Sequence, residues 1–193
     1  LKNAQISFAT RLDNLQNQNR LLTGQVEELT NAIRQEKRST RELYTSIDER
    51  LGKFEPREVE VNGEKVMVQP QEQAAYDAAV ELLKAGDYKK AAAAFSTFGA
   101  EWPKSAYAAD AVYWRGSCLF ALEQYKSTIN VQNSLIRSYP KHPRVADAMI
   151  SVASSQAALG NVKAASATLA KVIKQYPNSD AAKTAAQLQK TLK

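Results

Sequence analysis

The 193-residue sequence contains one cysteine, Cys118, and one histidine, His142, so residue types that build many active sites are nearly missing. One thiol cannot form an internal disulfide, and without a Cys/His cluster there is no set of metal ligands. His142 stands in a turn between two prolines, away from any plausible nucleophile, so we expect a surface residue and not a catalytic base. Phosphate-binding Gly-rich loops and dinucleotide fingerprints are also missing. We therefore predict that the protein is not an enzyme and uses no metal or cofactor.

Long apolar runs and blocks of like charge are missing as well. No run of about 18 apolar residues occurs, so we expect no transmembrane segment. The net charge of +6 comes from Lys and Arg interspersed with Asp and Glu, without interleaved aromatic stripes, and this argues against nucleic acid as a partner. The chain begins at Leu1 rather than Met, and we expect a mature form whose export signal peptide has been removed.

Proline and glycine are scarce, with six and seven residues, whereas Ala, Gln, Lys and Leu are abundant. This composition favours an all-α fold. We predict a coiled-coil oligomerisation helix over residues 1–54, a β-hairpin linker over 55–70, and an α-solenoid over 71–193 that contains three tetratricopeptide-like helix pairs and a capping helix.

The first segment has the heptad period of a coiled coil. Apolar residues alternate at spacings of four and three, which keeps one seam facing a partner helix, and Glu36 and Thr40 interrupt the seam later. The uncharged residues beside the seam do not select an unlike partner, and Arg11–Gln16 comes close to a trimer-favouring pattern. We favour a parallel homotrimer over a dimer; a helix folded back on its own C-terminal domain is the alternative. The expected oligomerisation residues are Phe8, Leu12, Leu15, Asn19, Leu22, Val26, Leu29 and Ile33.

Two alternating segments, 58–61 and 65–68, flank Asn62-Gly63. Asn-Gly can adopt the two positive φ angles of a type I′ turn, so we predict a two-stranded hairpin, with an extended linker as the alternative. Because an isolated hairpin is marginally stable, we expect it to pack on the coiled coil or on neighbouring chains.

The rest of the sequence repeats with a period of 37 residues. An aromatic-Pro step ends each unit, and the Gly86-Asp87-Tyr88 turn returns as related residues at 123 and 160. This pattern resembles tetratricopeptide repeats. We expect repeats near 72–108, 109–145 and 146–182 with a cap to 193. The expected helices span 72–85, 88–102, 106–122, 125–139, 143–159, 162–176 and 179–192.

The first helices of such pairs line a concave surface, which we expect to be an apolar groove with acidic edges for a peptide that carries Lys or Arg. Aromatic residues at helical spacing also pack in cores, so both roles stay open for Tyr76 and Tyr113. The residues expected to line the groove are Tyr76, Val80, Leu83, Asp110, Tyr113, Ser117, Phe120, Asp147 and Ile150.

Three segments carry a closer resemblance: 111–116 (Ala-Val-Tyr-Trp-Arg-Gly), 145–149 (Val-Ala-Asp-Ala-Met) and 174–183. Together with the coiled coil, they resemble the periplasmic cell-division coordinators of the Tol–Pal system. The resemblance implies a periplasmic adaptor without enzymatic activity. Its implied partners are the periplasmic part of the inner-membrane Tol protein and a bifunctional penicillin-binding protein, and its implied role is to coordinate outer-membrane constriction with septal cell-wall synthesis.

Two other functions compete with this interpretation. One is a tetratricopeptide scaffold of outer-membrane protein assembly or of another envelope complex, for which we would expect a lipidated N-terminal Cys and more repeats. The other is a hydrolase accessory or peptidoglycan-binding module, although no paired carboxylates stand in a recognisable setting.

Overall fold

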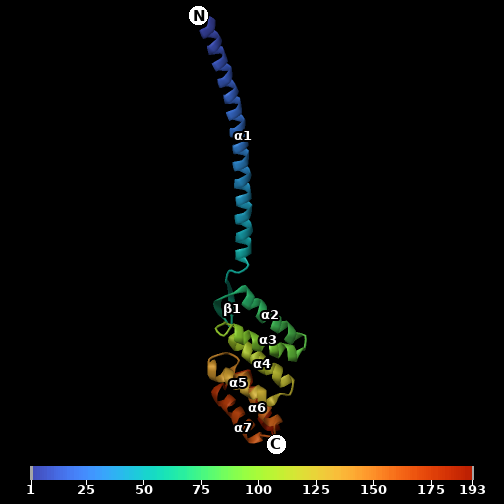
Figure 1. Ribbon diagram of the computed structural model, residues 1–193. Coiled ribbons are helices and arrows are strands. Elements are labelled where there is room, and N and C mark those ends of the chain that lie inside the picture. The colour runs from blue at the N-terminus through green and yellow to red at the C-terminus, as the bar shows by residue number, and fades with distance from the viewer. Residues whose placement is uncertain (1, 193) are drawn as a thin grey trace. The chain divides into compact units, whose positions relative to one another are not determined.

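The computed structural model describes residues 2–192, which fall into two units divided between Lys53 and Phe54. The first unit is one continuous helix, α1 (Lys2–Gly52), shown in Figure 1. Its 51 residues correspond to a length of about 77 Å at 1.5 Å per residue. The second unit contains a hairpin and seven helices. This arrangement confirms the predicted all-α fold with one short hairpin and a helical solenoid.

The hairpin joins β1 (Arg57–Val61) to β2 (Glu64–Val68) within one chain. Asn62 and Gly63 have φ angles of 53° and 84°, as the predicted two-residue turn requires. We expected the hairpin to pack on the coiled coil or on neighbouring chains; within the second unit it packs on the first repeat. Val61 and Val68 enter the core of the first repeat, where Val68 is 1% exposed, because the alternating valines give the hairpin one apolar face.

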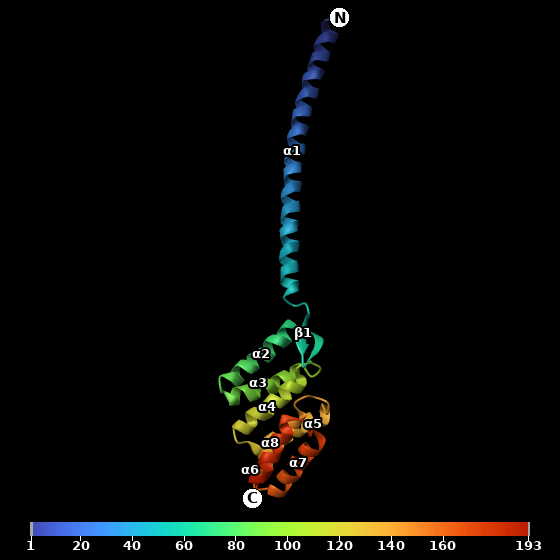
Figure 2. The same ribbon diagram turned by 180° about the vertical axis from the view of Figure 1, so that it is seen from behind.

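Seven helices follow in chain order, and each packs on the next (Figure 2). Their ends lie within two residues of the predicted ones, since the turn and aromatic-Pro steps that limit them repeat in the sequence. The helices are α2 (Pro70–Lys84), α3 (Tyr88–Glu101), α4 (Ala108–Ala121), α5 (Tyr125–Ser138), α6 (Val145–Ala158), α7 (Val162–Gln175) and α8 (Asp180–Thr191).

The turn inside each pair depends on a left-handed residue. Gly86, Glu123 and Gly160 have φ angles of 76°, 58° and 79°, and they end α2, α4 and α6. Two of the following helices begin with a side-chain cap: Asp87 accepts from the Lys90 N–H, and Asn161 from the Ala164 N–H. Five large side chains of the second helices are at most 1% exposed and form the cores of the helix pairs, namely Phe95, Phe98, Leu135, Leu169 and Val172.

Candidate partner-binding surface

The nine residues predicted to line a groove come from α2, α4 and α6, and α4 and α6 contact each other directly. The structure gives them three different environments. Asp110 is buried, whereas Phe120 and Asp147 are exposed. The others are half-buried: Tyr76, Val80, Leu83, Tyr113, Ser117 and Ile150.

Tyr76 belongs to an aromatic cluster in the first repeat. Its ring stacks on Tyr107 with a centroid distance of 4.4 Å, and it meets Phe95 and Phe98 edge-on at 6.0 and 5.6 Å. Burial, and then the charge of Asp110, raises the pKa of the Tyr76 hydroxyl far above its usual value. Most of this side chain therefore serves packing, and only part of it remains for a partner.

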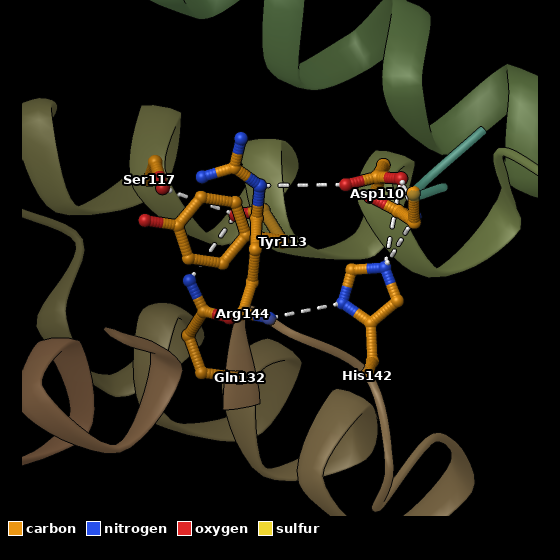
Figure 3. A network of polar contacts seen from close by, with 7 residues as sticks. Asp110, Tyr113, Ser117, Gln132, His142 and Arg144 are labelled. Carbon is orange, nitrogen blue, oxygen red and sulfur yellow. Dashed lines mark hydrogen bonds and ion pairs between the residues drawn. The ribbon is translucent and has the colours of Figure 1, made fainter. Parts of the chain in front are cut away.

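Asp110 was expected at an exposed acidic edge, and this is wrong: the residue is 6% exposed. The Asn62 side chain donates a 2.9 Å hydrogen bond to its Oδ2 atom. Arg144 Nε lies 3.4 Å from Oδ1, and His142 Nε2 lies 3.5 Å from Oδ2 (Figure 3). The hairpin turn and the segment between α5 and α6 thus cover the carboxylate, which joins three parts of the domain.

His142 lies in a turn, as predicted, but the expectation of a surface side chain is wrong, because only 9% of that side chain is exposed. Its Nδ1 accepts a hydrogen bond from the Arg144 backbone N–H at 3.3 Å. Its Nε2 lies 3.5 Å from Oδ2 of Asp110 and 3.1 Å from the side-chain nitrogen of Asn62. The ring's neighbours are an amide, a carboxylate and a backbone group, so it holds the turn in place.

Arg144 adds a cation that sequence reasoning missed. Its guanidinium lies 4.9 Å from the centroid of the Tyr113 ring and 4.5 Å from that of Trp114. The two rings meet edge-on at 5.0 Å. Because Arg144 also approaches Asp110, this part of the surface is not the acidic edge that we expected. Tyr113, Trp114 and Arg144 form one half-buried aromatic–cation cluster.

The other predicted groove residues differ in what they offer a partner. Phe120 is 37% exposed, and its ring meets Tyr125 edge-on at 5.6 Å. Asp147 is an exposed carboxylate. The Ser117 hydroxyl donates to the Tyr113 carbonyl, so its proton is already used within α4. Accessible apolar surface is thus concentrated at Phe120, and accessible negative charge at Asp147.

The predicted oligomerisation residues lie along α1 and are exposed in the single chain. The seven apolar members are between 47% exposed (Leu12) and 68% exposed (Phe8), and Asn19 is exposed as well. An apolar stripe of this length in water favours association, because each leucine-sized side chain gains roughly 1.5–3 kcal/mol on burial.

No group of three or more His, Cys, Asp or Glu in residues 2–192 could hold a metal ion. In the same part of the chain, no helix combines the length and the hydrophobicity needed to cross a membrane. Cys118 is fully buried in α4, and burial raises the pKa of its thiol to about 11. The thiol is therefore protonated near neutral pH and acts as a small packing group.

Two family models match the chain, one for each unit. The model described as TolA binding protein trimerisation covers residues 1–60, and the model described as outer membrane lipoprotein (YfiO) covers residues 68–193. Neither description is that of an enzyme.

A curated relative, the cell division coordinator CpoB of Pseudomonas putida, is 49% identical over 41 residues. This match covers 21% of the chain and 15% of the relative, so it spans a small part of that protein. It agrees with the resemblance noted in the sequence.

Solved structures with similar folds include the type III secretion chaperone SycD of Yersinia enterocolitica with a peptide of the translocator YopD. That match has a TM-score of 0.56 at 16% identity, over 65% of this chain and 94% of that one. PcrH from Pseudomonas aeruginosa matches with a TM-score of 0.55 at 14% identity, over 66% and 95%. At such identities the likeness establishes the helical-repeat fold alone.

Proposed function

We propose that this chain, which belongs to the family described as outer membrane lipoprotein through residues 68–193, is a trimeric periplasmic adaptor in Tol–Pal-associated cell division. The observation that carries the proposal is that one chain joins two matched segments. A helix with an exposed heptad stripe matches the trimerisation model, and a helical-repeat unit follows it. The match to a cell division coordinator supports the same role.

The two units have separate tasks in this proposal. The heptad stripe of α1 associates three chains, which sets the number of repeat units per assembly. Each repeat unit binds protein segments, and tethering raises the effective concentration for a second contact wherever the geometry allows it.

The expected partners are the periplasmic part of the inner-membrane Tol protein and a bifunctional penicillin-binding protein. The description of the trimerisation model, which names a TolA binding protein, supports the first partner. The second rests on the family resemblance of segments such as 111–116. Binding both would couple outer-membrane constriction to septal wall synthesis.

Within the repeat unit, the proposed contact surface is the Tyr113–Trp114–Arg144 cluster with Phe120 and Asp147. Two edge-on rings and a guanidinium give a surface for aromatic or acidic groups, while Phe120 offers apolar area and Asp147 accepts a cation. A segment that alternates apolar and charged side chains fits these groups.

A scaffold role in outer-membrane protein assembly is the second candidate, because the repeat unit matches a family described by an outer membrane lipoprotein. The trimerisation match at residues 1–60 and the cell division relative favour the first candidate.

Analytical ultracentrifugation of the full chain, alone and with the periplasmic region of the Tol protein, tests the proposal. We expect a trimer alone and a heavier species with the partner. The Tyr113→Ala and Arg144→Ala variants should weaken the complex, whereas Lys126→Ala, at an exposed site outside the cluster, should not. A monomeric chain would refute the trimer, and an unchanged sedimentation profile with the partner would refute the adaptor role.

A further inference from the structure

Helix α6 carries two stripes on opposite sides. Asp147 and Ile150 belong to the predicted groove, whereas Val145, Met149 and Val152 recur at spacings of four and three on another side. The second stripe forms the floor of a hollow whose walls come from α5 and α7. We call this hollow the α5–α7 groove.

The α5–α7 groove has the size and floor of a binding cleft. Its volume is about 560 Å³, within the roughly 300–1,000 Å³ typical of ligand sites. The three α6 residues of the floor are buried, and Ile136 of α5 extends the apolar surface. Core packing therefore holds the floor in place, while the half-buried Ile136 and Tyr176 leave part of their apolar surface accessible.

The rim of the groove is polar and carries positive charge. Asn133, Gln156 and Gln175 contribute amide groups, and Lys171 contributes an ammonium group, while no carboxylate lines the groove. Among the described residues, the side chains of Asn133, Gln175 and Lys171 form no hydrogen bond or ion pair with the rest of the chain. These groups remain available to a bound segment.

The same features are missing one repeat earlier. At a shift of 37 residues, Arg115 replaces Val152, Gly99 replaces Ile136, and Ser134 replaces Lys171. The earlier junction thus has a charged residue where the groove has an apolar floor, and it lacks the rim cation. The groove belongs to the junction of the second and third repeats and is not a general property of the repeat.

We propose that the α5–α7 groove binds an extended peptide segment of a partner protein that carries apolar side chains and a carboxylate. An extended backbone presents unpaired N–H and C=O groups that the rim amides can satisfy, whereas a helix pairs these groups internally. The charge of this part of the chain favours an acidic segment: Lys171 lines the groove, and residues 120–193, which supply all of its lining, hold ten Lys or Arg against three Asp or Glu. This inference does not depend on the trimer or on the Tol partner.

Fluorescence anisotropy of the full chain with labelled ten-residue peptides tests the proposal. Three probes share their apolar residues: an acidic peptide kept extended by proline, the same peptide with Lys in place of each Glu, and an acidic Ala-rich helical peptide. We expect the extended acidic probe to bind about tenfold more tightly than either of the others.

Two variants locate the binding. Lys171→Glu should weaken the extended acidic probe about tenfold, whereas Lys174→Glu, an identical charge change on the same helix outside the groove lining, should change it less than about twofold. Val152→Arg, which copies Arg115 of the preceding repeat, should block the groove. Circular dichroism establishes whether this variant folds. If it does not fold, the comparison of Lys171→Glu with Lys174→Glu decides whether the probe binds in the groove.

Equal affinity for the acidic and basic probes, or equal effects of the two lysine variants, would overturn the proposal. Loss of binding in Tyr113→Ala with full binding in Lys171→Glu would also overturn it, because the probe would then bind at the aromatic–cation cluster and not in the α5–α7 groove. The ultracentrifugation result for the Tol partner does not bear on any of these outcomes.

Discussion

Asn62, in the turn of the β-hairpin, donates a 2.9 Å hydrogen bond to the buried carboxylate of Asp110 on α4, 48 residues later in the chain. The hairpin is therefore a structural part of the repeat unit. The bond fixes the hairpin turn beside the residues that hold the aromatic–cation cluster, because Arg144 lies against the other oxygen of the same carboxylate.

Removing this bond should destabilise the repeat unit. Asn62→Gly keeps the positive φ angle and deletes the donor, so we expect the free energy of unfolding to fall by about 1.5–3 kcal/mol, the range for a hydrogen bond to a charged group. Urea denaturation measures the change. In an Asp110→Ala background the same substitution should cost much less. An equal loss of unfolding free energy in both backgrounds would show that the hydrogen bond does not contribute to stability. Glu64→Ala, at an exposed hairpin site, serves as the control.

Gly116 should tolerate no side chain. A Cβ atom at this position would lie 2.5 Å from Cδ of Gln132, whose Nε2 donates to the Tyr113 carbonyl. Gly116→Ala should therefore cost about 1–3 kcal/mol in thermal or urea unfolding, the usual cost of overpacking. Gly99→Ala is the matched control, because its Cβ would meet nothing within 4 Å in the α3 helix, and it should stabilise by about 0.5–1 kcal/mol.

A double variant separates overpacking from other causes. Gly116→Ala with Gln132→Ala should lose less stability than the sum of the single changes, since the shortened side chain leaves space for the new methyl group. Strictly additive losses of unfolding free energy would show that a Cβ atom at position 116 does not clash with the Gln132 side chain.

Much of the fold could be predicted because its signals are local and repeated. The aromatic-Pro steps, the turns at Gly86 and Gly160, and Asn62-Gly63 act on their own neighbours, so helix ends and the hairpin followed from the sequence. The periodicity also placed α2, α4 and α6 together as one potential surface.

The environment of the site could not be predicted in the same way. Asp110, His142 and Asn62 meet only after the hairpin docks on the repeats, and no residue pattern encodes a contact across 48 or 80 positions. Periodicity assigned Asp110 to an exposed face, but the docked hairpin covers it. The contact between the Arg144 guanidinium and the Trp114 ring was not predicted either, because Arg144 lies just before α6 and outside the helical register.

The stability of the repeat unit should fall at high pH because of Tyr76. Burial, and then the charge of Asp110, raises the pKa of its hydroxyl above the ordinary 10.0. The unfolded chain then releases the Tyr76 proton near pH 10 while the folded chain retains it, so the contribution is fully present below pH 10 and is lost as the pH rises.

Urea unfolding between pH 9 and pH 11.5 measures this loss, with a slope of at most about 1.4 kcal/mol per pH unit for one group. Tyr76→Phe should reduce the slope without abolishing it, because burial also raises the pKa of Tyr107. An unaltered slope in Tyr76→Phe would contradict the assignment.

The heptad stripe predicts which leucines of α1 hold the oligomer together. Leu22 belongs to the stripe and Leu21 does not, although their exposed fractions in the single chain are similar, 56% and 64%. Leu15→Lys combined with Leu22→Lys would place ammonium groups in two seam layers of every chain, and each lost leucine contact removes roughly 1.5–3 kcal/mol. We expect this variant to sediment as a single chain, while Leu21→Lys keeps the oligomer because position 21 faces solvent in a coiled coil. The reverse result, or dissociation of both variants, would mean that α1 associates through a different face.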